Sequence, residues 1–302
     1  MHDIIVIGAG PAGLTAALYA LRADKSVLVL EKATFGGQIT FSPQIENYPG
    51  FASMSGNEFA DKLVDQVINQ GADIEMETVT EIRDNGDTKT VITEDGEHEA
   101  KAVIIATGVK HRQTGLPNEN ELVGEGISYC AVCDGAFFKG QTVAVLGGGN
   151  SALQEAVLLS DGCEKVYVIQ NLDYFTGEAR LVEKLKEKEN VEFIMGTVIS
   201  SLNGNGSLES LTLRKEADGS ESELRVNGLF VAIGLIPNNK IFADIAGLDE
   251  WGYIDSDESC LTKTEGVFVA GDCRKKQIRQ ITTAAADGSV AALAACRYID
   301  SK

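Results

Sequence analysis

The chain has 302 residues, of which 44% are hydrophobic and 24% are charged, a balance typical of a globular protein long enough for two domains. Its formal net charge of −19 argues against nucleic acid and anionic membranes as partners. No apolar run approaches the roughly 18 residues of a membrane span, and Met1 is followed by a strand pattern instead of a signal peptide, so we expect a cytoplasmic protein.

The first 31 residues have the pattern of a dinucleotide-binding fold. A β-branched run over residues 4–7 predicts a buried strand, and the loop Gly8-Ala9-Gly10-Pro11-Ala12-Gly13 leads from it into an Ala/Leu-rich helix. A second predicted strand over residues 26–30 ends at Glu31. The glycines allow a tight turn and close backbone approach to a pyrophosphate, and an acid at the strand end can bind a ribose diol.

Residues 35–108 predict a loop region, a helix and a small sheet. The segments 35–40 and 45–51 are rich in Gly, Pro and Asn and predict loops that either fold over a cofactor or connect elements at the surface. Residues 57–70 have helical spacing, and residues 74–93 predict an antiparallel meander. The run 102–108 predicts a buried strand that ends in small residues, which permit close approach by a ligand.

Two cysteines stand in a C-x-x-C motif, Cys130 and Cys133, followed at once by Asp134. Such a pair closes a disulfide or forms a dithiol with one acidified thiol, so it can hold two electrons. A carboxylate next to it can carry the proton that thiol exchange must move. The same spacing occurs in zinc sites, but zinc needs four ligands and the other cysteines and the histidines are scattered. The pattern therefore favours a redox pair and no metal site.

The chain then repeats its opening. A predicted strand over residues 142–146 runs into Gly147-Gly148-Gly149-Asn150-Ser151-Ala152 and a helix, and a second predicted strand covers residues 165–169. This is a G-x-G-x-x-A loop between strand and helix, which suits a second dinucleotide. A predicted meander over residues 193–225 and a strand over 228–234 complete the repeat.

The last segment returns to the first unit. A short strand over residues 267–272 ends in Gly271-Asp272, and an Ala-rich helix covers residues 282–298. We expect this strand to join the first sheet. The predicted fold class is α/β, with two Rossmann-like, three-layer ββα nucleotide-binding domains: residues 1–112 and 244–302 form the first, and residues 113–243 are inserted into it.

A basic cluster precedes the last helix. It consists of Arg274, Lys275, Lys276 and Arg279. In a chain this acidic, such a cluster either docks an acidic protein or balances local charge.

Taken together, these motifs resemble those of low-molecular-weight thioredoxin reductases over essentially the whole chain. The C-x-x-C-D just before the second nucleotide unit distinguishes this group from lipoamide-dehydrogenase-like enzymes, whose redox cysteines lie near the first. The resemblance implies a homodimeric FAD protein with a second, pyridine-nucleotide domain. It rests on the segments Gly8–Gly13, Gly36–Gln38, Glu46–Gly50, Ala106–Gly108, Cys130–Asp134, Gly147–Ala152, Gly271–Asp272 and Arg279–Gln280.

The resemblance also implies roles for individual residues. Cys133 would face the flavin, Cys130 would attack the thioredoxin disulfide, and Asp134 would be the acid/base. The implied FAD contacts are Gly8, Gly10, Pro11, Ala12, Gly13 and Glu31 at the adenosine and pyrophosphate, Gln38 and Asn47 along the middle, Asp272 at the ribityl–pyrophosphate region and Gln280 near the isoalloxazine, with Gly37, Ala106, Thr107, Gly108, Gly271, Arg279 and Ile281 beside them. The implied pyridine-nucleotide loop is Gly147, Gly149, Asn150, Ser151 and Ala152.

The chain departs from the family at the end of its second nucleotide unit's second strand. Members that use NADPH carry His-Arg-Arg there and a further Arg a few residues on, whereas this chain has Gln170-Asn171-Leu172 and Thr176. A 2′-phosphate prefers guanidinium groups, and Asp173 would repel it. The amides of Gln170 and Asn171 can still hydrogen-bond a ribose diol. NADH is therefore favoured over NADPH, with a reduced ferredoxin or a partner flavoprotein as the alternative donor.

The expected activity is a two-electron relay from a donor through FAD and the Cys130/Cys133 disulfide to the disulfide of thioredoxin. One alternative is a reductase of a different redoxin or a peroxiredoxin, fed by reduced ferredoxin or another non-nucleotide donor. The non-enzyme alternative is a flavin/thiol redox sensor whose cysteine pair reports redox state to a protein partner.

Overall fold

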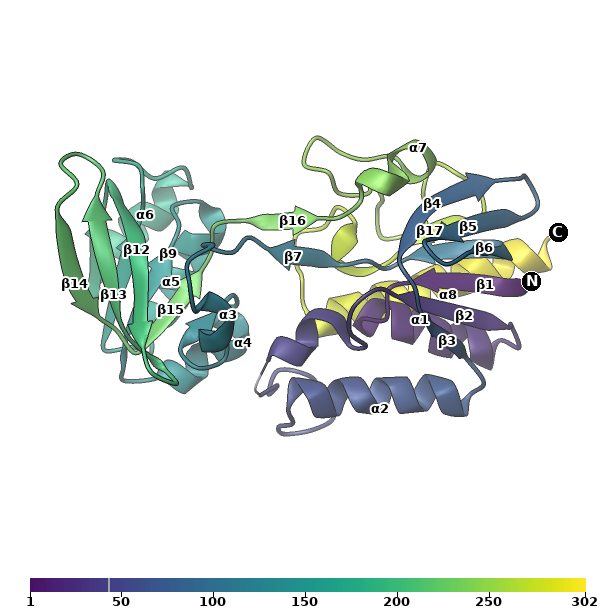
Figure 1. The fold of residues 1–302 in the computed structure, drawn as a ribbon, viewed down its shortest axis with the longest axis horizontal. Helices are drawn as coiled ribbons and strands as arrows, with labels where there is room; N and C mark the ends of the chain where they lie inside the picture. Colours follow the sequence, from purple (N-terminus) through teal and green to yellow (C-terminus); the bar gives the residue numbers. More distant parts are fainter. Residues whose placement is uncertain (43) are drawn as a thin grey trace. The chain divides into compact units, whose positions relative to one another are not determined.

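The computed structural model describes residues 1–42 and 44–302, which form two compact units. One unit consists of Met1–Lys110 together with Ile236–Lys302, and the other is His111–Leu235. The chain therefore leaves the first unit once and returns to it (Figure 1). Within the described ranges, no helix is both long and apolar enough to cross a membrane.

The first unit is built on a seven-stranded sheet. Its strands lie in the order β3-β2-β1-β6-β5-β4, with β17 paired to β6 (Figure 1). The strand expected to return to this sheet does so, since β17 pairs in parallel with β6. The strands are β1 (His2–Ile7), β2 (Val27–Glu31), β3 (Asp73–Met76), β4 (Val79–Asp84), β5 (Lys89–Thr93), β6 (Glu97–Ile105) and β17 (Val267–Val269).

Alternate residues of β1 pack into two different cores, which makes the unit three-layered. Ile4 and Val6 face a core shared with α1 (Pro11–Arg22) and α8 (Ile281–Asp300), which lie side by side (Figure 1). Small residues bring these two helices close, because a Cβ at Gly288 would strike the Ala12 carbonyl. Ile5 and Ile7 face the other core, to which β4 and β5 contribute. A further helix, α2 (Gly56–Asn69), is capped by Ser55, whose side chain accepts the backbone N–H of Glu58.

The second unit repeats this plan. Its five-stranded sheet has the order β11-β10-β9-β15-β8, and every pairing in it is parallel. The strands are β8 (Ile127–Ser128), β9 (Thr142–Leu146), β10 (Lys165–Ile169), β11 (Val191–Ile194) and β15 (Gly228–Val231). A separate antiparallel sheet is formed by β12 (Thr197–Gly204), β13 (Leu208–Lys215) and β14 (Glu221–Arg225).

Alternation along β9 again separates two cores. Val143 and Val145 pack with α5 (Asn150–Ser160) and α6 (Ala179–Lys186), whereas Ala144 faces the core shared with β12 and β13. The predicted α/β class, with two Rossmann-like domains of three ββα layers each, is thus confirmed. The remaining short elements are β7 (Val109–His111) and β16 (Leu235–Pro237), which pair with each other, α3 (Glu119–Leu122), α4 (Ala131–Asp134), α7 (Ala243–Ala246) and the 3₁₀ helices η1 (Gly37–Phe41), η2 (Gly135–Phe138), η3 (Lys240–Phe242) and η4 (Gly271–Cys273).

The structure corrects the extent of both predicted meanders. Residues 73–76 and 191–194 pair in parallel with β2 and β10, and only the strands after them are antiparallel. Each of these strands follows a helix that crosses back over its sheet, and such a crossover places the next strand parallel to its neighbour. The loop predicted at residues 35–40 also contains the short helix η1.

The boundaries between the two compact units lie at residues 110/111 and 235/236. The domain boundaries predicted from the sequence are 112/113 and 243/244. Phe242, Ile245 and Ala246 lie in a core cluster of the first unit together with β1 and β6 residues.

Candidate functional site

A cavity of about 550 Å³ lies in the first unit around the loop between β1 and α1. Most residues that the sequence assigns to FAD line it. These are Gly8, Gly10, Pro11, Ala12, Glu31, Gly37, Gln38, Ala106, Thr107, Gly108, Asp272, Gln280 and Ile281. The cavity therefore gathers segments from the start, the middle and the end of the chain at one edge of the sheet.

Four other predicted FAD residues are absent from the cavity lining. Gly13 is buried in α1 at a point where a Cβ would strike the Gly8 carbonyl. Asn47 donates a hydrogen bond to Gln280 Oε1 (3.3 Å). Gly271 is the backbone neighbour of Asp272, and Arg279 reaches the Asp272 carbonyl (3.5 Å) with its guanidinium over the Tyr253 ring.

The glycine loop is shaped by close backbone packing. Gly8 has φ = +108°, and a Cβ there would strike the Ala106 carbonyl. The first helical residues of α1 follow Gly10, which provides no side-chain cap, so backbone N–H groups stay available at this helix end. Glu31 accepts hydrogen bonds from the backbone N–H groups of Ala9 (2.8 Å), Lys32 and Ala33 (2.9 Å each). The loop thus offers N–H groups to a phosphate and a carboxylate to a ribose.

Asp272 carries an unused hydrogen-bonding atom. Its Oδ1 atom is buried and has no partner among the described residues. Burial raises the pKa of Asp272 to about 6, against the opposing charges of Lys276 and Arg279. A buried carboxyl oxygen without a partner is costly unless a ligand satisfies it. Together with the glycine loop and Glu31, this atom fits the hydroxyl and diphosphate groups of FAD.

The two motif cysteines lie in the second unit, where they form a disulfide. Cys130 is the N-cap of α4, and the backbone N–H of Cys133 donates to Cys130 Sγ (3.2 Å). Val132, between the cysteines, is 58% exposed. The N–H bond favours a thiolate at Cys130 once the disulfide is reduced.

Asp134 is joined to the disulfide through Ser128. The Ser128 hydroxyl donates to Asp134 Oδ2 (2.6 Å) and accepts the backbone N–H of Cys130 (3.0 Å). The Asp134 Oδ1 atom is buried and has no partner in the described chain. Burial raises the pKa of Asp134, and the Ser128 bond opposes that rise. The carboxyl can therefore hold a proton beside the cysteine pair.

The second glycine loop is covered by the segment that follows β10. The backbone N–H groups of Thr176 (2.9 Å) and Gly177 (3.0 Å) both donate to the Gly148 carbonyl. The Gln170 side chain lies against Gly148 and is bonded to the Tyr174 carbonyl (3.3 Å). Gln170, one of the two amides expected to face a ribose, is therefore turned inward and only 6% exposed.

The predicted helix start of this loop is also engaged. The Asn150 side chain accepts the backbone N–H of Glu178 (2.7 Å) and donates to its carboxylate (3.3 Å). Ala152 is fully buried, and Gly147 has φ = +135°. The Glu178 carboxylate thus adds negative charge at the end of α5, where a pyrophosphate would need positive charge.

Comparison with known proteins identifies the family. The family described as pyridine nucleotide-disulphide oxidoreductase matches residues 2–288. The chain belongs to this family. It is therefore an oxidoreductase, and FAD is the cofactor that the first cavity fits.

Members of the family are similar to this chain over its whole length. Thioredoxin reductase of Bacillus subtilis (strain 168) is 40% identical over 301 residues, which cover 99% of this chain and 95% of the relative. Thioredoxin reductase of Listeria innocua is 41% identical over 99% of this chain and 94% of its own. The crystal structure of thioredoxin reductase from Streptococcus pyogenes is 38% identical, covers 100% of this chain and 99% of that chain, and has a TM-score of 0.96.

The oxidoreductase also contains site residues that sequence reasoning missed. Ser128 stands two residues before Cys130, and a hydroxyl in that place carries no periodic or compositional signal. Glu155 lies on α5, where the backbone N–H of Ala131 in the cysteine motif hydrogen-bonds to its carboxyl and Oε2 is buried without a partner in the described residues. Burial raises the pKa of Glu155 to about 8. The sequence signal that could have identified Glu155 is its position on the helix face that carries the buried residues Ala152 and Ala156.

One acid–histidine group forms beside the first cavity, which Glu77 helps to line. His98 Nε2 lies 2.9 Å from Glu77 Oε2 and 3.9 Å from Glu75 Oε2, which brings together residues that the sequence leaves scattered. Glu77 also accepts the Thr93 hydroxyl (2.6 Å). These partners satisfy the Glu77 carboxylate within the sheet.

Proposed function

We propose that this oxidoreductase is a thioredoxin reductase that passes two electrons through Cys130 and Cys133 to the disulfide of thioredoxin. The observation that carries the proposal is the Cys130–Cys133 disulfide with a proton-holding carboxyl, Asp134, linked to it through one serine. The 40% identity to proteins named thioredoxin reductase supports the choice of thioredoxin as acceptor. The homodimer implied by the sequence resemblance stays part of this proposal.

In the proposed mechanism, the residues that line the first cavity would hold FAD, which would supply the electron pair that reduces the disulfide. Cys133 accepts this electron pair at its sulfur, the S–S bond breaks, and Cys130 leaves as a thiolate held by the Cys133 N–H. The Cys130 thiolate attacks one sulfur of the thioredoxin disulfide, and the other thioredoxin sulfur departs as a thiolate. Cys133 then attacks Cys130 Sγ, which re-forms the Cys130–Cys133 disulfide and releases the second thioredoxin thiolate.

Asp134 moves protons in this exchange. Because burial raises its pKa, the carboxyl can give a proton to a departing thiolate and take it back from the next thiol. The Ser128 hydroxyl keeps Asp134 Oδ2 in one orientation relative to the Cys130 backbone.

For the electron donor, we propose NADH over NADPH. The segment after β10 has Gln170, Asn171, Leu172 and Thr176 where guanidinium groups would hold a 2′-phosphate. Arg180 is the nearest arginine along the chain, but it is bound to the Glu178 carboxylate (3.6 Å). This arrangement supports a nucleotide without the extra phosphate.

A protein donor, such as a reduced ferredoxin or a partner flavoprotein, is the second candidate. It is favoured by the Glu178 carboxylate at Asn150, which places negative charge at the N-terminus of α5, where the pyrophosphate of a nucleotide would bind. Anaerobic titrations of the donor separate the two candidates.

Steady-state turnover tests the proposed function. The FAD-loaded protein, an electron donor that bleaches its flavin and an excess of oxidised thioredoxin should yield many reduced thioredoxins per enzyme. A flavin/thiol sensor would be reduced once and stop. Turnover with a peroxiredoxin or another redoxin but not with thioredoxin would contradict the choice of acceptor.

A further inference from the structure

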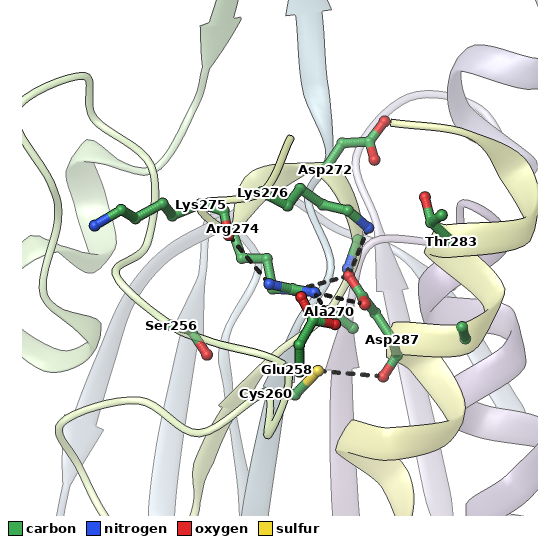
Figure 2. A network of polar contacts seen from close by, with 12 residues as sticks. Ser256, Glu258, Cys260, Ala270, Asp272, Arg274, Lys275, Lys276, Thr283 and Asp287 are labelled. Carbon is green, nitrogen blue, oxygen red and sulfur yellow. Dashed lines mark hydrogen bonds and ion pairs between the residues drawn. The ribbon is translucent and has the colours of Figure 1, made fainter. Parts of the chain in front are cut away.

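A buried ionic network lies behind the Gly271–Asp272 turn (Figure 2). Asp287 Oδ2 accepts hydrogen bonds from the backbone N–H of Gly271 (3.0 Å), from Arg274 Nε (2.8 Å) and from Lys276 Nζ (2.8 Å). Arg274 Nη2 donates to the second oxygen, Oδ1 (2.9 Å). The three side chains are only 2–7% exposed. One carboxylate therefore joins two cations to the backbone of the turn that carries Asp272.

Within the network, the single Asp287 carboxylate faces two buried cations, Arg274 and Lys276. Burial alone would raise the pKa of Asp287, but the hydrogen bonds from Arg274 and Lys276 lower it, so Asp287 is a carboxylate. Arg274 also reaches Glu258 (3.2 Å), whose side chain is 92% exposed and screened by water. Arg274 and Asp287 already form a complete bidentate pair. Lys276 is thus an additional buried cation, and such a charge is unfavourable without a further partner.

Asp272 lies on the same side as the Lys276 ammonium. Figure 2 shows the Lys276 side chain running toward Asp287 on the side where Asp272 lies, whereas the Lys275 side chain points the opposite way. Lys276 is the strongest of the charges that lower the pKa of Asp272 against the effect of burial. The turn itself lines the cavity that fits FAD. The Lys276 charge therefore lies beside the part of the cavity that Asp272 lines.

We propose that Lys276 is a positioning residue for FAD, which acts with Asp287 and Arg274 to fix the Gly271 backbone and to hold a positive charge beside Asp272. This inference rests on FAD as the cofactor of the first unit. For these two residues of the basic cluster, the buried pairing favours local charge balance over docking of an acidic protein.

Lys275 provides a matched control one residue away. Its side chain is 61% exposed and pairs with the exposed Asp255 (3.3 Å). Lys275→Met and Lys276→Met remove the same group from adjacent positions, one outside the network and one inside. Lys276→Gln keeps a hydrogen-bond donor for Asp287 but removes the charge, and Lys276→Arg keeps the charge.

The test is the affinity of the apoprotein for FAD, followed by the quenching of flavin fluorescence. Lys276→Met and Lys276→Gln should each weaken FAD binding about tenfold, as expected for the loss of one charged partner. Lys276→Arg should bind within about threefold of the unsubstituted protein, and Lys275→Met within about twofold. FAD binding by Lys276→Gln equal to that of Lys275→Met would overturn the proposal.

Thermal unfolding with and without FAD distinguishes positioning from plain stability. A merely structural Lys276 would lower Tm equally in both forms and leave the FAD-induced rise in Tm unchanged. The proposal requires a smaller FAD-induced rise in Lys276→Gln than in Lys275→Met. If the unsubstituted protein did not bind FAD at all, the proposed cofactor would fail, which is a different outcome from equal binding by all variants.

Discussion

The Ser128 hydroxyl donates a hydrogen bond of 2.6 Å to Asp134 Oδ2, and its oxygen, Ser128 Oγ, accepts the Cys130 N–H. One serine thereby links the acid that follows the cysteine motif to the cysteine that begins it. The remaining Asp134 oxygen, Oδ1, is buried and free of partners in the described residues. The proton-holding group and the disulfide are thus built as one unit on β8 and α4.

Ser128→Ala should move the pH dependence of disulfide reduction upward. The Ser128 bond lowers the pKa of Asp134 against the effect of burial, so loss of this bond should raise that pKa further. The fall in activity as Asp134 loses its proton should then occur at higher pH. Rate–pH profiles with thioredoxin measure this shift, and the exposed Ser207→Ala serves as the control. Superimposable profiles would contradict the linkage.

Asp134→Asn should slow turnover by about a hundredfold, since the amide cannot exchange the proton that thiol exchange requires. FAD binding should be unchanged because Asp134 belongs to the other unit. Steady-state rates and flavin fluorescence measure the two effects. Retention of the full rate would exclude Asp134 as the acid/base.

Glu155 predicts a loss of stability as pH rises. Burial raises its pKa from 4.5 to about 8, so the folded chain holds a proton that the unfolded chain releases above pH 4.5. The folded state is therefore progressively penalised between about pH 4.5 and 8, and the full penalty applies above pH 8. Between about pH 4.5 and 8, the Tm of the unsubstituted protein should therefore fall relative to the Tm of Glu155→Gln. A Tm difference that does not vary with pH would contradict the buried, protonated carboxyl.

Donor preference should follow the charge of the segment after β10. Anaerobic titration of the FAD-loaded protein should show faster flavin bleaching by NADH than by NADPH. Asn171→Arg should improve NADPH relative to NADH, because a guanidinium can bind the 2′-phosphate. Failure of both nucleotides, with bleaching by dithionite, would reject NADH and favour the protein donor.

The fold was predictable where local pattern and packing agree. Gly8 and Gly13 indicate the first nucleotide fold because each lies where a Cβ would strike a neighbouring backbone carbonyl. Glu31 at the end of the second strand completes the pattern. The parallel pairing of β3 with β2 and of β11 with β10 was missed because such short strands do not reveal their pairing partners. The parallel direction of each strand is set by the helix that crosses back over the sheet before it.

The candidate site was predictable in its cysteines and glycines, but not in its supporting groups. The sequence does not show that Gln170 is buried against Gly148 and therefore turned away from a ribose. This burial depends on how residues 171–178 fold over the loop. Asp287 and Lys276 are 11 residues apart in sequence and meet only through the turn before α8. Contacts of this kind are fixed by tertiary structure and leave no periodic signal.

Trapping of the mixed disulfide tests the central claim most directly. Cys133→Ser should leave Cys130 free to attack oxidised thioredoxin and should accumulate a covalent 1:1 adduct through Cys130, because no second thiol can resolve it. Mass spectrometry without reductant, with Cys130→Ser as the matched variant, measures the adduct. We expect the adduct in Cys133→Ser and its absence in Cys130→Ser. An adduct only in Cys130→Ser would reverse the two roles, and no adduct in either would contradict thiol transfer to thioredoxin.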